Sequence, residues 1–301
     1  MSSRAREVAA RIGRVGVWSS HLQWQPAGRA QELVRRMEDL GFGAVWVGEA
    51  TGKESIANAS ILLAGSERIV VATGIASIWA RDPVAMVNAG RTLGEAYPGR
   101  FLMGLGVSHP FLTDPRGRPY RTPLEHMRWY LEAMDGAPWA GPPADPAPRV
   151  VAALGPKMLE LARDRTEGAH PYFVPVEHTT RARAILGRDA LLAPEQAVSL
   201  GPDLAAARDR ARPYLRTYLA LENYRANLIR LGWGEGDMAG SGSERLADAL
   251  VACGTVGVAV DRVRAHLDSG ADHVAVRVLT DDPKAFPVEQ LEELAQAVLD
   301  L

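Results

Sequence analysis

The chain has 301 residues, of which 47% are hydrophobic and 23% charged, a balance typical of a globular protein large enough for one α/β barrel or two ordinary domains. The formal net charge of −2 gives no electrostatic basis for binding nucleic acid or an anionic membrane surface. The single cysteine, Cys253, excludes an internal disulfide and a zinc site built from several cysteines. The N-terminus lacks the apolar core of a secretion signal, and no run approaches the ~18 apolar residues that cross a bilayer. We therefore expect a cytoplasmic protein.

In the first half of the chain, strand-like and helix-like segments alternate. Residues 27–40 illustrate the helical pattern, because Leu33, Val34 and Met37 fall on one stripe and Gly41 ends the segment. The predicted strands here are residues 15–18, 44–47, 69–75 and 101–105, and the predicted helices are 27–40, 56–64, 83–96 and 124–134.

The second half continues the alternation after two loops rich in proline and glycine. The predicted loops are residues 110–123 and 136–148, the strands are 150–154, 169–174, 191–200 and 273–279, and the helices are 157–165, 179–186, 204–231 and 288–299, with a loop at 232–243 and two more helices before the last strand. Eight strand–helix units in a chain of this length favour a closed (β/α)8 TIM barrel over an open sheet. We expect one barrel domain over residues 1–301, with 1–13 as an N-terminal extension.

The segment 97–109 (YPGRFLMGLGVSH) carries the strongest indication of a site. Its proline and glycine end the preceding helix, and an apolar run of strand length follows. Ser108 and His109 therefore lie where the strand ends, which is the side of a parallel barrel that binds ligands. Histidine exchanges protons near neutral pH because its ordinary pKa is about 6.5. The alternative is that His109 only holds the following loop.

Other strand ends supply further candidates. Gly155, Pro156, Lys157 and Met158 open a helix directly after a strand, and the free N–H groups of a helix N-terminus bind phosphate or carboxylate; a simple connection is the alternative. The remaining candidates follow other strands and would line the same pocket or pack in the core: His170, Tyr172, Trp18 and Trp79.

Several motifs resemble those of the luciferase-like monooxygenases. The segment 41–49 (GFGAVWVGE) is similar to the second-strand signature of that superfamily. Further similar segments follow in family order: 81–83 (RDP), 99–101 (GRF), 152–157 (AALGPK) and 270–274 (GADHV). Together they resemble most the branch that uses the deazaflavin coenzyme F420. The resemblance implies an α/β fold, a (β/α)8 barrel of the luciferase-like type with loop insertions at its C-terminal face.

The resemblance also implies roles for individual residues. Glu49 stands where F420-dependent relatives place an acid near the reactive edge of the ring; the alternative is a glutamate that caps a helix or pairs with an arginine. Ala50 departs from the histidine of sugar-phosphate-oxidising relatives, so their substrate is not implied. Gly74 and Ile75 stand where relatives have a non-prolyl cis peptide behind the ring.

The remaining implied contacts concern the cofactor. Gly106 and Ser108 end the strand that faces the ring, and the loop at 155–158 would hold the phosphate-bearing tail. We expect hydride transfer between F420 and a small-molecule substrate, with His109 and Glu49 as the catalytic polar groups, no metal, and a homodimer. The substrate would be set mainly by the loops 110–123 and 232–243.

Three alternatives remain open from the sequence. One is an FMN-dependent monooxygenase on the same barrel, and a second is a non-catalytic homologue that binds flavin or deazaflavin. A metal-dependent barrel hydrolase is disfavoured, because strand one ends VWSS and His21 stands alone, without the His-x-His pair common there.

Overall fold

The computed structural model describes residues 2–117, 120–299 and 301; of the predicted loop 110–123, residues 118–119 lie outside this description, as do residues 1 and 300 of the predicted domain. The strands are β1 (Val15–Ser19), β2 (Ala44–Val47), β3 (Val70–Thr73), β4 (Ala76–Ser77), β5 (Phe101–Gly106), β6 (Arg149–Val151), β7 (Gly168–Ala169), β8 (Leu191–Leu192), β9 (Glu195–Leu200), β10 (Val251–Gly254) and β11 (Val274–Val278). Their order is β10-β9-β11-β1-β2-β3-β5-β6-β7-β8, with β4 paired to β5.

The sheet closes on itself through the segment that holds β8 and β9. These two strands are separated only by Ala193 and Pro194. On one side, the N–H of Ala193 donates to the carbonyl oxygen of Ala169 next to β7; on the other, the N–H of Ala275 in β11 donates to the carbonyl oxygen of Pro194, both at 2.9 Å. The same segment thus joins β7 to β11, which confirms the (β/α)8 barrel.

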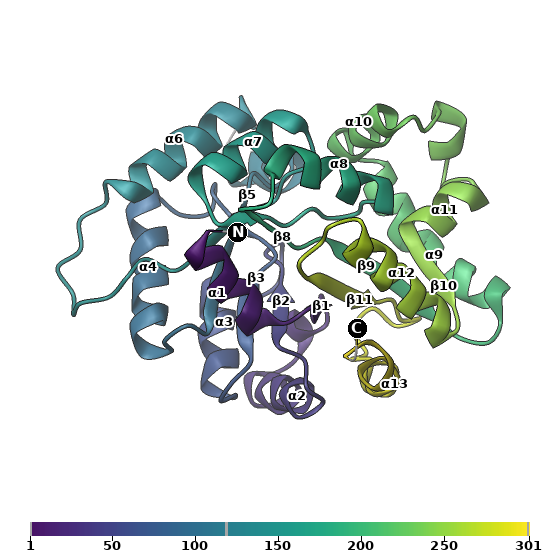
Figure 1. Cartoon of the computed structure of the whole chain (residues 1–301), viewed down its shortest axis with the longest axis horizontal. Helices are drawn as coiled ribbons and strands as arrows, with labels where there is room; N and C mark the ends of the chain where they lie inside the picture. The colour runs from purple at the N-terminus through teal and green to yellow at the C-terminus, as the bar shows by residue number, and fades with distance from the viewer. Residues whose placement is uncertain (1, 118–119, 300) are drawn as a thin grey trace.

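Helices surround the barrel, with α4 and α6 at one side and α9 to α11 at the opposite side (Figure 1). The helices are α1 (Ser3–Ile12), α2 (Ala27–Asp39), α3 (Ser55–Ala64), α4 (Pro83–Ala96), α5 (Pro110–Thr113), α6 (Pro123–Asp135), α7 (Pro156–Arg165), α8 (Val176–Leu186), α9 (Leu204–Leu219), α10 (Glu222–Leu231), α11 (Glu244–Leu250), α12 (Val256–Asp268) and α13 (Val288–Val298). Within the described ranges, no helix has both the length and the apolar character needed to span a bilayer.

Local sequence explains the clearest of these elements. Helix α4 begins after Asp82, whose side chain accepts a hydrogen bond from the N–H of Ala85 at 3.0 Å, and it has Pro83 in its first turn. Strand β5 is buried along its whole length. Its Gly104 has no room for a side chain, because a Cβ there would lie 1.9 Å from the carbonyl oxygen of Thr73.

The N-terminal segment is part of the barrel's packing. Within the predicted N-terminal extension, residues 3–12 form α1, whose Val8 and Ile12 join the cluster that fills the barrel interior around Trp46 and Leu102. The spacing of the buried residues Ala5, Val8 and Ile12 is helical. This helix closes the interior with apolar side chains.

Several predicted elements differ from the structure. The strand predicted at 69–75 ends at Thr73 as β3, with β4 following it, and the one predicted at 191–200 is divided into β8 and β9. Of the strand predicted at 169–174 only the start is in β7, and Phe173 beyond it has a left-handed φ of 56°. The helical region 204–231 is divided into α9 and α10, and β10 precedes α12 where we expected only helices.

Boundaries also differ at two places in the polar segments. The predicted loop 110–123 contains α5 and a 3-10 turn, η2 (Asp114–Arg116). The helix predicted from Thr179 begins at Val176, because Thr179 is buried inside α8 and bonds the Nδ1 of His266 at 2.7 Å.

Candidate functional site

A cavity of about 390 Å³ opens at the C-terminal ends of the barrel strands. Most of the residues that the sequence singled out line it: Glu49, Gly74, Ile75, Gly106, Ser108, His109, His170, Tyr172 and Trp18. The other lining side chains come largely from the β1 end, from α5, and from α9 and α10. Trp79 lies outside this lining, and its indole Nε1 instead donates to the carbonyl oxygen of Val107 at 2.7 Å.

The floor of the cavity is formed where β3 ends. The peptide bond between Gly74 and Ile75 is cis, as the resemblance implied. A Cβ at Gly74 would lie 2.6 Å from Nε1 of Trp18 and 3.2 Å from Nε2 of His170. A Cβ at Gly106 would meet the side chain of Ile75 at 2.5 Å. The floor therefore depends on glycine at both positions, because a side chain at either would occupy the space at the end of β3 or displace its neighbours.

His170 presents an unused hydrogen-bond acceptor to this floor. Its Nδ1 donates to the carbonyl oxygen of Ala193 at 2.6 Å, and its ring stacks on Trp46 with centroids 4.2 Å apart. Burial lowers the pKa of His170 to about 4, so the ring is neutral at pH 7. Because Nδ1 carries the proton, Nε2 holds a lone pair, and no residue that the structure describes donates a hydrogen bond to it.

The side chain of His109 extends from the loop after β5. Ser108 before it has a left-handed φ of 56°, which turns the chain from β5 toward α5. Aromatic rings hold the imidazole: Phe111 is stacked at 5.8 Å and Tyr224 lies at 5.6 Å, centroid to centroid. Burial lowers the pKa of His109. In the described parts of the chain, its nitrogens have no hydrogen-bond partner.

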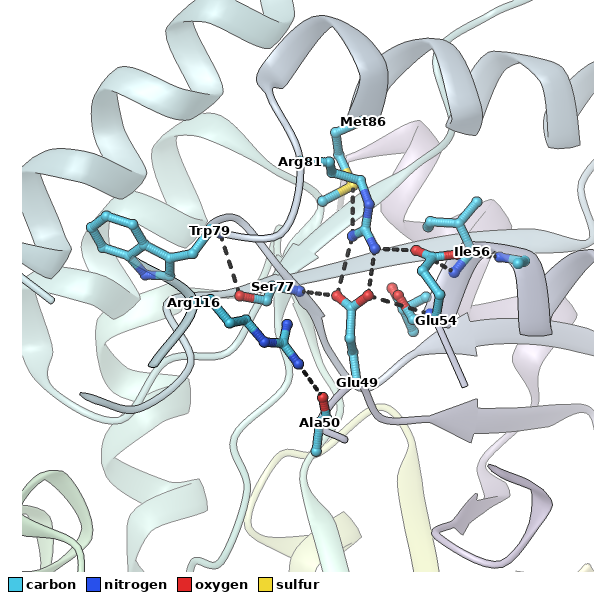
Figure 2. Close-up of polar contacts among 12 residues, drawn as sticks. Glu49, Ala50, Glu54, Ile56, Ser77, Trp79, Arg81, Met86 and Arg116 are labelled. Carbon is cyan, nitrogen blue, oxygen red and sulfur yellow. Dashed lines mark hydrogen bonds and ion pairs between the residues drawn. The ribbon is translucent and has the colours of Figure 1, made fainter. Parts of the chain in front are cut away.

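The carboxylate of Glu49 is surrounded by protein donors, as Figure 2 shows. Arg81 donates to both of its oxygens, the N–H of Ser77 donates to Oε2 at 2.7 Å, and the N–H of Ser55 donates to Oε1 at 3.4 Å. Arg81 also pairs with Glu54, which caps α3. The Glu49 side chain is only 5% exposed. It is thus held in an ion pair, the alternative that the sequence had left open.

The structure adds a cationic group that the sequence reasoning missed. Arg277 of β11 lines the cavity, and its Nη1 donates to the hydroxyl oxygens of Tyr172 and, at 3.4 Å, Tyr218. Its guanidinium lies 4.7 Å from the ring centroid of Trp18. An arginine inside an otherwise apolar strand was the available signal, since arginine is rarely buried without a reason. Tyr218 and Tyr224 gave no signal, because they lie on helices remote in sequence.

Four predicted cofactor residues lie beside the cavity and do not line it. Gly155, Pro156, Lys157 and Met158 begin α7 next to Leu154, the last lining residue of that segment. No side chain caps this helix at Gly155, and the guanidinium of Arg230 lies 3.6 Å from where a Gly155 Cβ would stand. The start of α7 is therefore a cationic helix N-terminus adjoining the cavity.

Comparison with known proteins places this architecture among relatives. The family model described as luciferase-like monooxygenase matches residues 10–273. The chain is 29% identical over 179 residues to a putative coenzyme F420-dependent oxidoreductase of Mycobacterium tuberculosis; the alignment covers 58% of this chain and 48% of that protein, so the chain spans about half its length. It is 24% identical over 293 residues to a 5,10-methylenetetrahydromethanopterin reductase of Methanolobus tindarius, covering 83% and 90% of the two chains.

Solved structures share the fold. An F420-dependent secondary alcohol dehydrogenase in complex with an F420–acetone adduct matches with a TM-score of 0.75 and 16% identity, over 95% of this chain and 98% of that one. The oxygenating constituent of a 3,6-diketocamphane monooxygenase of Pseudomonas putida, in complex with FMN, matches with a TM-score of 0.70 and 13% identity, over 95% and 98%.

Proposed function

Because this chain belongs to the luciferase-like monooxygenase family, and is thus an oxidoreductase, we propose that it transfers a hydride between coenzyme F420 and a small organic substrate. The observation that carries the choice of cofactor is the likeness to the F420-dependent mycobacterial protein. A deazaflavin has carbon where flavin has N5, so it supplies two-electron hydride transfer and little oxygen activation.

The residues present fit such a cofactor. The cavity of about 390 Å³ lies in the range of ligand pockets, and Gly74 leaves free the space that a Cβ would fill. The unpartnered Nε2 of His170 would accept a hydrogen bond from a ring N–H. The start of α7, with Arg230 beside Gly155, would hold the phosphate of the tail through free N–H groups and positive charge.

In this proposal His109 is the residue that moves a proton. Its lowered pKa keeps the imidazole neutral at pH 7, so the ring would accept a proton from a substrate hydroxyl when the substrate is oxidised, and return it in the reverse direction. Phe111 and Tyr224 hold the ring in place. In this proposal Glu49 is a positioning residue: its carboxylate is paired with Arg81, so we assign it to positioning the ends of β2 and β4.

The second candidate is an FMN-dependent monooxygenase on the same barrel. The structural match to the FMN-bound camphane monooxygenase favours it, although that likeness concerns the fold. Such an enzyme would require reduced FMN and oxygen, and His109 would then serve the oxygenated substrate.

Direct titration of the purified protein with F420 and, in parallel, with FMN separates the two. We expect F420 to bind with micromolar or tighter affinity and FMN at least tenfold more weakly. Tight FMN binding with weak F420 binding would move the enzyme to oxygen-dependent chemistry. Failure to bind either cofactor would overturn both proposals and leave the barrel intact.

A further inference from the structure

A second cavity lies beside the first, on the side of β1, β11 and α9. Its volume is about 770 Å³, and it shares four lining residues with the first cavity: Ser20, Thr217, Tyr218 and Arg277. Arg277 is therefore part of the lining of both cavities. A ligand held there would reach the hydride-transfer site at one end and the second cavity at the other.

In the described part of the chain, no counterion is in direct contact with the guanidinium of Arg277, although the buried Glu195 acts electrostatically on it. In the ranges that the structure describes, no carboxylate lies within 4.0 Å of its guanidinium. Its protein partners are hydroxyl groups: Tyr172 and Tyr218 at Nη1, and Ser20 at Nη2 with a long contact of 3.4 Å. Among the described residues, its Nε has no hydrogen-bond partner, but this atom is itself buried. Nη2, whose one protein contact is the long one to Ser20, therefore has hydrogen-bonding capacity left for an anion.

The acids nearby are already engaged. Asp281, which lines the second cavity, is paired with Arg210 at 2.9 Å, and Asp209 is paired with Arg212 at 2.8 Å. Glu195 is buried and accepts hydrogen bonds from the hydroxyl of Tyr214 at 3.3 Å. Burial raises the pKa of Glu195 to about 7, so this carboxyl is partly protonated at neutral pH.

We propose that Arg277 binds an anionic group of the substrate, a carboxylate or a phosphate, at the junction of the two cavities. This inference rests on the proposed hydride transfer, and it names the class of substrate: a small organic molecule with one anionic group at a distance from the carbon that exchanges hydride. Ser20 and Tyr218 supply hydroxyl groups to the same anion. The anion belongs to the substrate because the cofactor contacts proposed above lie on β3, β5, the segment after β7 and α7, whereas Arg277 lies on β11 beside β1.

The test uses simple probes with six carbon atoms each and different head groups, two of them anionic and one neutral. Binding of hexanoate, hexyl phosphate and neutral hexanamide to the F420-loaded full-length protein is measured by calorimetry. We expect one of the two anions to bind at least tenfold more tightly than hexanamide, and the better of the two identifies the anionic group. Equal binding of all three probes by the wild-type protein would overturn the proposal without any variant.

Variants then locate the effect. Arg277→Gln should bring the anion to the affinity of hexanamide, and Arg277→Lys should keep part of the preference because the charge remains. Arg29→Gln, at the exposed pair with Glu32 away from both cavities, should change nothing. The F420 affinity of each variant is measured separately and should stay within about threefold. If Arg277→Gln instead weakens F420 binding and leaves the anion preference, the guanidinium serves the cofactor and the proposal fails. If the wild-type protein does not bind F420 but still binds an anionic probe more tightly than hexanamide, the proposed function is overturned and the anion site is supported.

Discussion

The indole Nε1 of Trp18 donates a hydrogen bond of 3.1 Å to the carbonyl oxygen of Gly74. This bond crosses β2 and ties the end of β1 to the end of β3 at the floor of the cavity. It leaves no space for a side chain at Gly74 on that side, since a Cβ would lie 2.6 Å from the same nitrogen.

Gly74→Ala should therefore impair cofactor binding. The added methyl group would displace Trp18 or take up the space beside Nε2 of His170, so we expect the F420 Kd to rise at least tenfold, about 1.4 kcal/mol. Fluorescence titration measures it. Gly201→Ala is the matched control, because a Cβ there has nothing within 4 Å. An unchanged Kd for Gly74→Ala would show that the cofactor does not use this floor.

Arg81→Gln should destabilise the fold. Arg81 and Glu49 are 14% and 5% exposed, and removal of one partner of a buried ion pair leaves the other charge uncompensated, at a cost of about 3–5 kcal/mol. Urea unfolding monitored by circular dichroism gives the free energy of unfolding. Arg29→Gln breaks the exposed pair with Glu32 and should cost less than about 1 kcal/mol. Equal costs for the two variants would contradict a structural role for the Glu49 pair.

His109→Ala should separate proton transfer from cofactor binding. We expect kcat to fall by roughly 100-fold or more, the usual contribution of a general acid or base, with the F420 Kd within about threefold of wild type. His126→Ala is the control, since His126 stacks on Trp79 at 4.0 Å outside the cavity lining.

The pH profile of oxidation gives a second measure of His109. Burial lowers the pKa of this imidazole from 6.5, and a proton acceptor must be neutral. The rate should thus be constant above pH 6.5 and fall as the pH drops through the lowered pKa. The falling limb should vanish in His109→Ala; a limb that persists would assign proton transfer to another group.

Acid should destabilise the chain through its buried histidines. Burial lowers the pKa of five of them far below 6.5, to about 4 for His21, His170, His178 and His273 and to about 3 for His266. Below pH 6.5 these histidines bind protons in the unfolded chain but stay neutral in the folded chain. The free energy of unfolding should therefore decrease from pH 6.5 toward pH 4.

The buried carboxyl group of Glu195 makes stability depend on pH in the opposite direction. The pKa of Glu195 is raised from 4.5 to about 7 by burial, so its contribution to stability is complete below pH 4.5 and is lost as the pH rises through 7. Five histidines outweigh one glutamate, and urea unfolding at pH 5 and pH 7 should show lower stability at pH 5. Glu195→Gln should make that difference larger. Higher stability at pH 5 would contradict the neutral state of the histidines.

The sequence predicted correctly those elements that local residues begin and end. Strand β2 and helix α4 lie at the residues we predicted, because an apolar run between glycines and a proline after an N-cap specify them without tertiary help. Strand β10 could not be predicted, since its four residues are held by pairing with the far half of β9. The left-handed backbone conformation of Phe173, beyond the short β7, is likewise not revealed by the sequence.

The site residues that lie at or near the ends of strands could be predicted from the sequence. Gly74, Gly106 and His109 come directly after or within strands of the barrel, and strand ends converge at one face. The role of Glu49 needed the position of Arg81, which lies 32 residues away along the chain. Tyr218 and Arg277 meet only because the barrel closes between β9 and β11.

The closing strand also divides the pocket by chain segment. One wall comes from residues before position 173, such as Gly74, Ile75 and His170, and the other from α9, α10 and β11, with Thr217, Asn223 and Arg277. Mutational libraries confined to α9 and α10 would thus change the substrate preference of the pocket and leave the residues before position 173 unchanged. The same separation lets natural divergence alter substrate choice by changing one stretch of the gene.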